Sequence, residues 1–186
     1  MKTWTQLALL GSFLFIALAQ ASVAPLSLIE GQDLVHSRTI RQDLKLNEKA
    51  ATAVVFLSAR CPCSNSHEAT LDALSKKFPH IAFLGVHSNT DEPLKETLAH
   101  FKESPIQFPV VQDPDAKVAQ AFGAFKTPHV YLIASNGEIL YQGGVDDSHY
   151  SPSASQHYLE DALVALQNGK KPNPAQTRTL GCIIKR

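Results

Sequence analysis

The sequence predicts an α/β protein in which helices flank a central mixed β-sheet. Short apolar runs rich in β-branched residues alternate with segments whose apolar residues recur at helical spacing. Near the end of this alternation, Asn136-Gly137 separates two apolar runs and is typical of a β-hairpin turn. Alternating strands and helices require a mainly parallel sheet, and the hairpin adds antiparallel strands at one side.

The expected strands are short apolar runs bounded by polar or turn residues. The run at 53–57 is typical of a strand buried on both faces. A less regular pattern predicts a short strand or a pair of strands around 34–46. The remaining strands are expected at 81–86, 108–111, 130–134 and 139–142.

The expected helices lie between and after these strands. The first follows Ser64 or Asn65, either of which can cap it, and ends at Pro79. Its apolar stripe consists of Ala69, Leu71, Leu74 and Phe78. The others are expected at 92–101 with Pro93 in the first turn, at 116–122 before Gly123, and at 156–167.

Residues 1–21 have the pattern of a secretory signal peptide. Lys2 supplies a positive charge, 7–19 is apolar, and Ala19-Gln20-Ala21 presents small residues at a cleavage site. The apolar stretch is shorter than the ~20 residues that a membrane-spanning helix needs. We therefore expect cleavage before Ser22, a periplasmic or extracellular protein, and no stable membrane anchor after cleavage.

Composition narrows the possible functions of the exported part. Acidic and basic residues are equal in number, at 17 each, so a nucleic-acid partner is not expected. The three cysteines cannot all pair within one chain. A single domain of this size can build its core without disulfides, which leaves reactivity or metal binding as the reason for cysteine.

Cys61 and Cys63 form a Cys-Pro-Cys segment between the first buried strand and the first helix. Free amides and the helix dipole stabilise an anion at a helix N-terminus, so the pKa of Cys61 is expected to be lowered and its thiol to be the most reactive. Pro62 fixes the turn. The end of a strand in an α/β sheet is also where ligands bind. The alternative is that both cysteines are small buried apolar residues.

Three segments carry a resemblance to a known family: VVFLSARCPCS after the first core strand, KTPHVYLI at the opening of the hairpin, and GEILYQGGVDD at its close. They resemble the thioredoxin-like superfamily, in the redoxin or peroxiredoxin-like branch related to alkyl hydroperoxide reductase and thiol-specific antioxidant (AhpC/TSA) proteins. The resemblance covers about 50–169. It implies a thioredoxin-like redoxin domain at 22–169 and leaves a basic tail at 170–186.

The resemblance also implies roles for particular residues. Cys61 takes the place of the first cysteine of a Cys-x-x-Cys motif, Ser64 replaces the second, and Cys63 is an added thiol. Peroxiredoxins polarise the peroxide with a Thr and an Arg, for which this chain offers Ser58 and Arg60. Pro128, after Thr127, corresponds to the cis-proline that faces the active cysteine. The catalytic candidates are Cys61, Cys63, Cys182, Ser58, Thr127 and Pro128.

A copper-binding chaperone or thiol carrier of the same fold is the alternative. Cys61 and Cys63, with His129 and His67, would form a soft thiolate and imidazole set suited to Cu(I). His67 could equally be a solvated residue in the first turn of the helix. The redox interpretation requires no cofactor.

Cys182 lies in a tail that contains five basic residues and no acidic residue. Pro172 and Pro174 stop the last helix from continuing, and the roughly thirteen residues before Cys182 reach roughly 40 Å when extended. A disulfide between Cys61 and Cys63 would be strained. We therefore expect Cys182 to pair reversibly with Cys61 or Cys63, in its own chain or in a partner subunit.

These observations favour an exported thiol-dependent oxidoreductase, either peroxide-reducing or active in thiol–disulfide exchange. In it, Cys61 attacks and Cys63 or Cys182 resolves. Its partner is then a protein thiol or disulfide, or a peroxide. A third hypothesis is a redox-inactive interaction domain that keeps only the fold.

Overall fold

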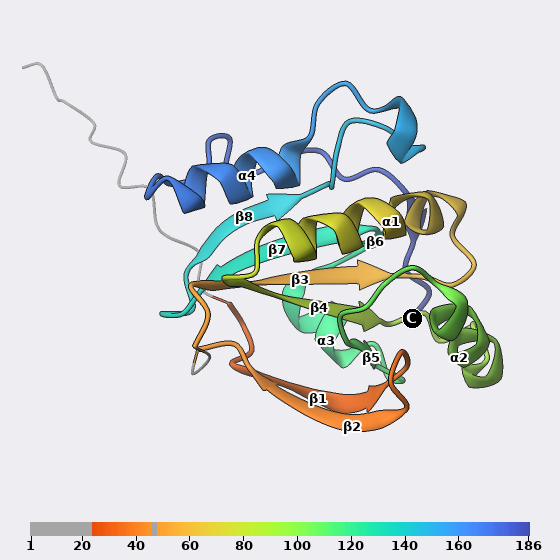
Figure 1. Ribbon diagram of the computed structural model, residues 1–186. Coiled ribbons are helices and arrows are strands. Elements are labelled where there is room, and N and C mark those ends of the chain that lie inside the picture. The colour runs from red at the N-terminus through yellow and green to blue at the C-terminus, as the bar shows by residue number, and fades with distance from the viewer. Residues whose placement is uncertain (1–23, 46–47) are drawn as a thin grey trace, which may run out of the picture.

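A computed structural model describes residues 24–45 and 48–186 (Figure 1). The expected signal peptide lies outside the described residues. The strands are β1 (Leu28–Asp33), β2 (Arg38–Asp43), β3 (Ala51–Leu57), β4 (Ile81–His87), β5 (Val110–Gln112), β6 (Lys126–Thr127), β7 (His129–Ala134), β8 (Ile139–Gly143) and β9 (Cys182–Ile183). The helices are α1 (Pro62–Lys77), α2 (Leu94–Glu103), α3 (Lys117–Phe122), the 3₁₀ turn η1 (Ser151–Ser153) and α4 (Tyr158–Gln167).

The centre of the fold is a seven-stranded mixed sheet with the strand order β2-β1-β5-β4-β3-β7-β8. This confirms the predicted α/β architecture. The parallel part is smaller than predicted, because β3, β4 and β5 are parallel whereas every other pair of neighbours is antiparallel. The reason is that hairpins form both edges of the sheet. A separate two-stranded ribbon pairs β6 with β9 near the C-terminus.

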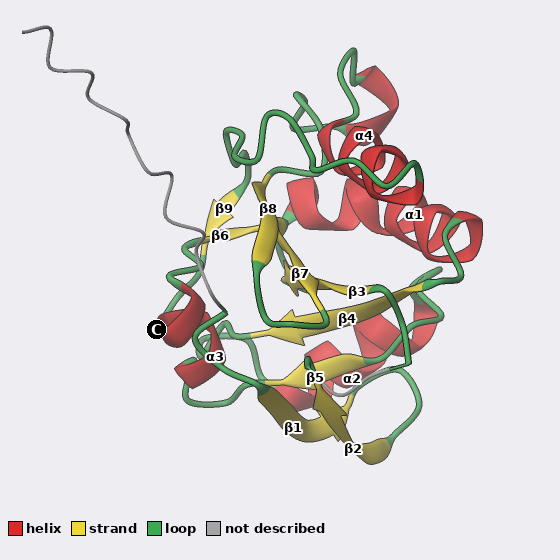
Figure 2. Cartoon of the chain, turned by 90° about the vertical axis from the view of Figure 1, so that its left-hand side faces the viewer, coloured by secondary structure: helices red, strands yellow, loops and turns green. Residues whose placement is uncertain are grey.

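Helices cover both faces of the sheet, so the central strands are mostly apolar. All seven residues of β3 are buried, as predicted. Val55 and its alternate neighbours pack in the cluster that includes α1, α2 and α4, whereas Val54 and Phe56 pack with α3. Figure 2 shows α1 and α4 together on one side, with α3 across the sheet.

Helix α1 begins earlier than the sequence pattern indicated. Cys61 is the residue before the first turn, and its sulfur accepts a hydrogen bond from the Ser64 amide, which leaves Pro62 at the first helical position. The predicted caps Ser64 and Asn65 therefore lie inside the helix. Ala69 was assigned to the apolar stripe but is exposed. In the described part of the chain, no helix is both long and apolar enough to cross a membrane.

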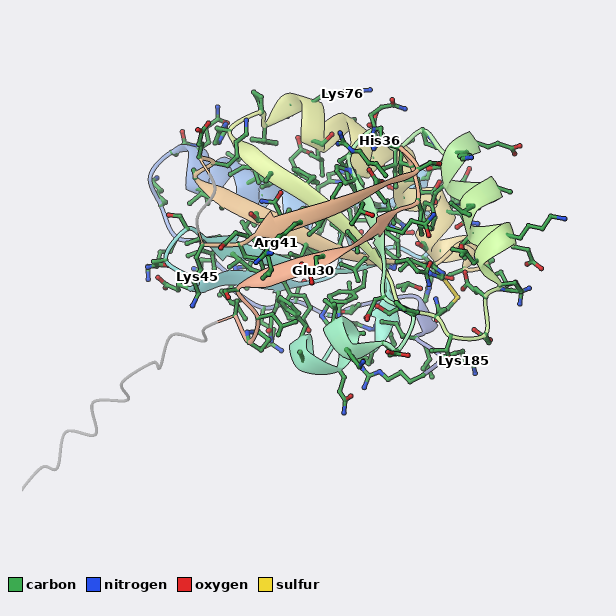
Figure 3. The ribbon with its side chains drawn as sticks, turned by 90° about the horizontal axis from the view of Figure 1, so that it is seen from below. Glu30, His36, Arg41, Lys45, Lys76 and Lys185 are labelled. Atoms are coloured by element: carbon green, nitrogen blue, oxygen red, sulfur yellow. A yellow bond between two sulfur atoms is a disulfide. The ribbon has the colours of Figure 1, made fainter. Side chains whose placement is uncertain are left out.

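The first two strands form a hairpin whose position differs from the expected 34–46. The turn falls at 34–37, so β1 precedes the expected range and pairs with β2 over its full length. Figure 3 shows Glu30 and Arg41 on these neighbouring strands, where their charged groups lie 3.9 Å apart. The other predicted elements agree with the structure to within about two residues at most of their ends.

Candidate active site

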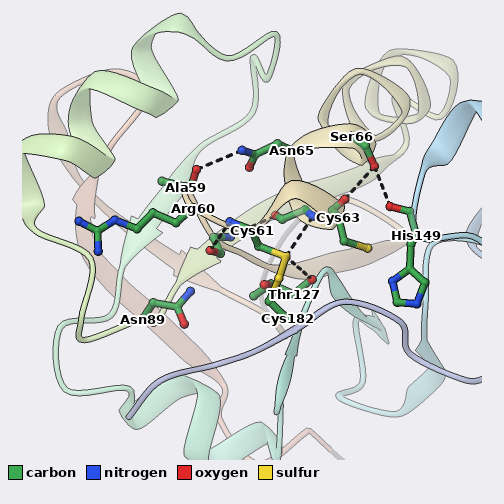
Figure 4. The surroundings of a disulfide bond; sticks show 12 residues. Ala59, Arg60, Cys61, Cys63, Asn65, Ser66, Asn89, Thr127, His149 and Cys182 are labelled. Carbon is green, nitrogen blue, oxygen red and sulfur yellow. Dashed lines mark hydrogen bonds between the residues drawn. A yellow bond between two sulfur atoms is a disulfide. The ribbon is translucent and has the colours of Figure 1, made fainter.

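The site is centred on a disulfide between Cys61 and Cys182 (Figure 4). Cys61 lies at the N-terminus of α1, and Cys182 lies in β9, at a sequence separation of 121 residues. The antiparallel β6–β9 ribbon pairs Thr127 with Cys182 and so brings the tail to the helix. Of the pairings that the sequence left open, the structure contains Cys61–Cys182 within one chain.

The tail reaches the site along the edge strand β8. The Gln142 amide donates to the Ala175 carbonyl, and the Thr177 amide donates to the Gln142 carbonyl. Further on, Gly181 has φ +131° and lies against the Thr127 carbonyl, where any Cβ would collide. Beyond Cys182, Ile184 is buried in the core on the α3 face. The tail is therefore built into the domain.

The surroundings of Cys61 favour a thiolate once the disulfide is reduced. The Ser64 amide donates to the Cys61 sulfur at 3.4 Å, and the sulfur lies at the N-terminus of a 16-residue helix. The Thr127 carbonyl oxygen is 3.3 Å from the same sulfur. In the disulfide this is a close contact, and a reduced thiol could donate there. The residue is only 1% exposed, so the docked tail shields it from solvent.

Glu92 anchors the loop before Cys61 and was not identified from the sequence. Its carboxylate accepts hydrogen bonds from Ser58 Oγ at 2.5 Å, from the Ala59 amide at 2.8 Å and from His87 Nε2 at 2.9 Å. Burial by itself would raise the pKa of Glu92, but the hydrogen bonds from His87, Ser58 and Ala59 outweigh it and lower the pKa. The only sequence signal was an acidic residue shortly after β4, at the edge where parallel strands end.

Ser58 and Arg60 are engaged with acidic side chains. The Ser58 hydroxyl donates its single proton to Glu92 and accepts from the Cys61 amide at 3.0 Å. The Arg60 guanidinium donates to Glu96 from two nitrogens. In this disulfide form both residues support the loop before Cys61. The peroxide-polarising roles that the resemblance implies for them stay predictions.

Cys63 is free and buried, and its side chain points away from the disulfide (Figure 4). Residues two positions apart on a helix do not face each other, which explains why it does not pair with Cys61. Burial raises the pKa of the Cys63 thiol, and the nearby charge of Asp146 raises it further. The predicted role of Cys63 as a partner of Cys61 is not observed.

The residues before β7 complete the site as the resemblance implied. The peptide bond between Thr127 and Pro128 is cis, which confirms the prediction for Pro128. Thr127 is buried and contributes its carbonyl oxygen to the contact with the Cys61 sulfur, whereas its hydroxyl has no hydrogen-bond partner among the described residues.

The residues considered for copper binding do not form a metal site in this structure; they are Cys61, Cys63, His67 and His129. His67 is buried, with Nδ1 2.6 Å from the Cys63 carbonyl oxygen and Nε2 3.0 Å from Asp146 Oδ1, so neither ring nitrogen remains for a metal. No group of three or more His, Cys, Asp or Glu residues within 24–45 and 48–186 is arranged to hold a metal ion. A copper site that used Cys61 with His129 would first require reduction of the disulfide.

A small cavity opens beside the disulfide. It has a volume of about 140 Å³ and is lined by both cysteines of the disulfide, by loop residues and by the end of the tail. Arg60 and Lys185 bring positive charge to it, and Asp91 and Glu92 bring negative charge. Of the two cysteines in its lining, Cys182 is an exposed residue and Cys61 is buried.

Comparison with known proteins agrees with this fold. The family model described as Redoxin matches residues 31–158. An uncharacterised conserved protein from Geobacillus kaustophilus superposes with a TM-score of 0.76 at 24% identity, over 89% of this chain and 91% of that one. No curated protein matches the chain.

Two further structures are similar at lower identity. A putative thiol:disulfide interchange protein DsbE from Chlorobium tepidum has a TM-score of 0.56 and 16% identity, over 66% of this chain and 82% of that one. Peroxidoxin BcpB from Mycobacterium tuberculosis has a TM-score of 0.57 and 16% identity, over 80% of this chain and 96% of that one. At these identities the similarity establishes the thioredoxin-like fold alone.

Proposed function

The chain belongs to the Redoxin family, and from that premise we propose that it is an exported thiol–disulfide oxidoreductase whose redox couple is Cys61–Cys182. The observation that carries the proposal is the disulfide itself, which joins a helix N-terminus to an exposed strand of the tail. This combines a stabilised thiolate with an exposed cysteine residue. No cofactor is required, because disulfide exchange moves electrons between sulfur atoms alone.

The two sulfurs have different roles in this proposal. A partner thiolate attacks the Cys182 sulfur, a new mixed disulfide forms, and the Cys61–Cys182 bond breaks. Both electrons of the broken bond remain on Cys61, which leaves as a thiolate. A second partner thiolate then attacks the partner's own sulfur in the mixed disulfide and releases Cys182. The partner is oxidised to a disulfide, and the chain is reduced to a dithiol that takes up two protons.

Access and leaving-group stability both favour attack on Cys182. Cys182 is an exposed residue, whereas Cys61 is 1% exposed. Exchange is faster when the departing thiolate is stabilised, and the Ser64 amide and the dipole of α1 stabilise Cys61. This assignment reverses the order expected from the sequence, in which Cys61 attacks and Cys63 or Cys182 resolves.

The remaining groups near the disulfide favour exchange over peroxide reduction. Ser58 donates its one proton to Glu92, and Arg60 donates to Glu96 and to the Asp91 carbonyl, so Ser58 has no free proton for a peroxide oxygen and three of the five Arg60 donors are already used. Cys63 is held as a thiol by its raised pKa. A dithiol or disulfide in a protein partner is therefore the proposed substrate.

Export is part of the proposal. The signal pattern at 1–21 directs the chain out of the cytoplasm, and a disulfide that closes most of the chain persists in an oxidising compartment. N-terminal sequencing of secreted or periplasmic material tests this part, with Ser22 expected as the first residue. An intact Met1 in a membrane fraction would contradict it.

Trapping the first intermediate tests the mechanism. Oxidised protein is mixed with glutathione, quenched within milliseconds with N-ethylmaleimide, and mapped by mass spectrometry. We expect glutathione on Cys182 and N-ethylmaleimide on Cys61 of the same molecules. The opposite labelling would overturn the assignment of the two sulfurs. Cys63→Ser is the matched control, because it removes the third thiol and leaves the expected pattern unchanged.

A further inference from the structure

A second and larger cavity lies outside the disulfide site. Its volume is about 450 Å³, within the range of small-molecule pockets. Three parts of the chain form its walls: 122–126 at the end of α3 and in β6, residues of β7 and β8, and 176–179 of the tail. Figure 2 shows α3, β6 and β8 around this side of the molecule, with β9 beside β6. Neither cysteine of the disulfide lines it.

One wall of this cavity is aromatic. Phe122 and Tyr131 meet edge to face with ring centroids 5.1 Å apart, and Phe125 meets His129 in the same way at 5.5 Å. Phe125 is 51% exposed, whereas Phe122, His129 and Tyr131 are at most 7% exposed. The Phe125 ring therefore offers most of the aromatic surface on which a planar ring can pack.

The charge of the cavity is positive. Lys126 and Arg178 line it, and its described lining contains no Asp or Glu. Lys126 lies over the Phe125 ring, 5.8 Å from the centroid, and donates to the Thr179 carbonyl, which fixes its ammonium group at the wall. Arg178 is an exposed residue of the tail. Both cations are therefore available for an anionic ligand group.

The lining also contains an unsatisfied polar atom. His129 is 5% exposed, and its Nδ1 has no hydrogen-bond partner among the described residues. A buried polar group without a partner is uncommon in folded proteins. Gln142, Gln176 and Thr179 add amide and hydroxyl groups to the same lining.

We propose that this cavity binds small planar aromatic carboxylates. The aromatic wall packs against the ring, and Lys126 and Arg178 pair with the carboxylate, while the described lining offers no opposing acidic group. Arg178 matches a carboxylate best, because its planar guanidinium can bind both oxygens.

The tail wall couples this site to the disulfide, and this part rests on the proposed redox couple. Arg178 lies in the segment that Cys182 fastens to Cys61. Reduction removes that covalent anchor and leaves the segment held by its backbone hydrogen bonds to Gln142 in β8 and by the short β6–β9 ribbon. A ligand that needs the docked tail must then bind the oxidised protein more tightly than the reduced protein. By linkage, the bound ligand must shift the equilibrium between dithiol and disulfide toward the disulfide by the same factor.

Calorimetric titration of the oxidised protein with 1-naphthoate tests the site, with neutral 1-naphthalenemethanol as the matched probe. We expect saturable 1:1 binding of naphthoate, at least tenfold tighter than that of the alcohol. Arg178→Gln should weaken naphthoate binding about tenfold and leave binding of the alcohol unchanged. Lys170→Gln, an exposed tail cation outside the cavity lining, is the control and should have no effect. Absence of naphthoate binding, or equal binding by wild type and Arg178→Gln, overturns the site.

Repeating the titration after reduction with dithiothreitol tests the coupling. We expect a several-fold weaker affinity for naphthoate in the reduced protein and in oxidant-treated Cys182→Ser, which cannot form the disulfide. An unchanged affinity would refute the coupling alone. Binding to the oxidised protein does not depend on disulfide exchange, so failure of the site and failure of the proposed function give different results.

Discussion

The Cys61–Cys182 disulfide should make a large contribution to stability, because it links residues 121 positions apart. The chain-entropy relation for a closed loop of that size gives about 16 cal/mol/K, or about 5 kcal/mol at 25 °C. This is an upper value, since the unfolded reduced chain retains some order. We expect reduction to lower the free energy of unfolding by about 2–5 kcal/mol.

Urea denaturation followed by far-UV circular dichroism measures this difference. The oxidised wild type, the reduced wild type and Cys182→Ser are compared, and the last two should have similar midpoints because both lack the cross-link. Cys63→Ser is the control, and its oxidised and reduced forms should differ as those of the wild type do. A loss of less than about 1 kcal/mol on reduction would mean that the disulfide is not a substantial part of the folded state in solution.

Three further predictions follow from individual residues. Cys63→Ser should change the rate of exchange with glutathione by less than about twofold, as stopped-flow thiol assays would measure, since Cys63 lies outside the couple; a tenfold loss would make it a participant. Glu92→Gln should lower the free energy of unfolding by about 2 kcal/mol at pH 7, because several donors lose their charged acceptor. The pKa of Glu92 is lowered in the folded state, so the loss of unfolding free energy in Glu92→Gln should be complete above the pKa of the unfolded chain, ~4.3. It should vanish as the pH falls through the lower pKa of the folded chain. A loss that does not depend on pH would exclude this carboxylate as the cause. Burial lowers the pKa of His129 from 6.5 to about 4, so between these pH values the imidazole binds a proton in the unfolded chain but not in the folded chain. The free energy of unfolding should therefore fall by ~3 kcal/mol between pH 6.5 and pH 4, and urea titrations of His129→Phe should lack this contribution. An equal dependence of the unfolding free energy on pH in both proteins would refute the prediction.

Local patterns were sufficient to predict the elements that surround the site. The buried run of β3 fixed the position of Cys61 at the start of a helix, and Asn136-Gly137 gave the hairpin that follows the cis Pro128. Each of these sequence patterns lies within a few residues of the strand, helix or turn that it predicts. The helix start was misplaced by a few residues because the cap is Cys61 itself, whose sulfur is an uncommon acceptor for this role.

Contacts between distant segments were not predictable from local patterns. The choice of Cys61 over Cys63 as the partner of Cys182 depends on the path of the tail along β8 and on the close approach of Gly181 to Thr127. Glu92 is part of the site because the end of β4 lies beside the end of β3. Glutamate is usually a surface residue, but here this neighbouring loop buries it and hydrogen-bonds to it. The place of the first hairpin in the sheet likewise depends on pairing between β1 and β5, which are far apart in the chain.

The proposed function requires that Cys61 and Cys182 interconvert reversibly between dithiol and disulfide. Equilibration of the protein in glutathione buffers of graded redox potential, followed by alkylation of free thiols and peptide mapping, tests this requirement. We expect one two-electron transition in which Cys61 and Cys182 lose and gain reactivity together while Cys63 stays constant. A disulfide that involves Cys63, or a Cys61–Cys182 bond that does not exchange in any of the buffers, would contradict the proposed redox couple.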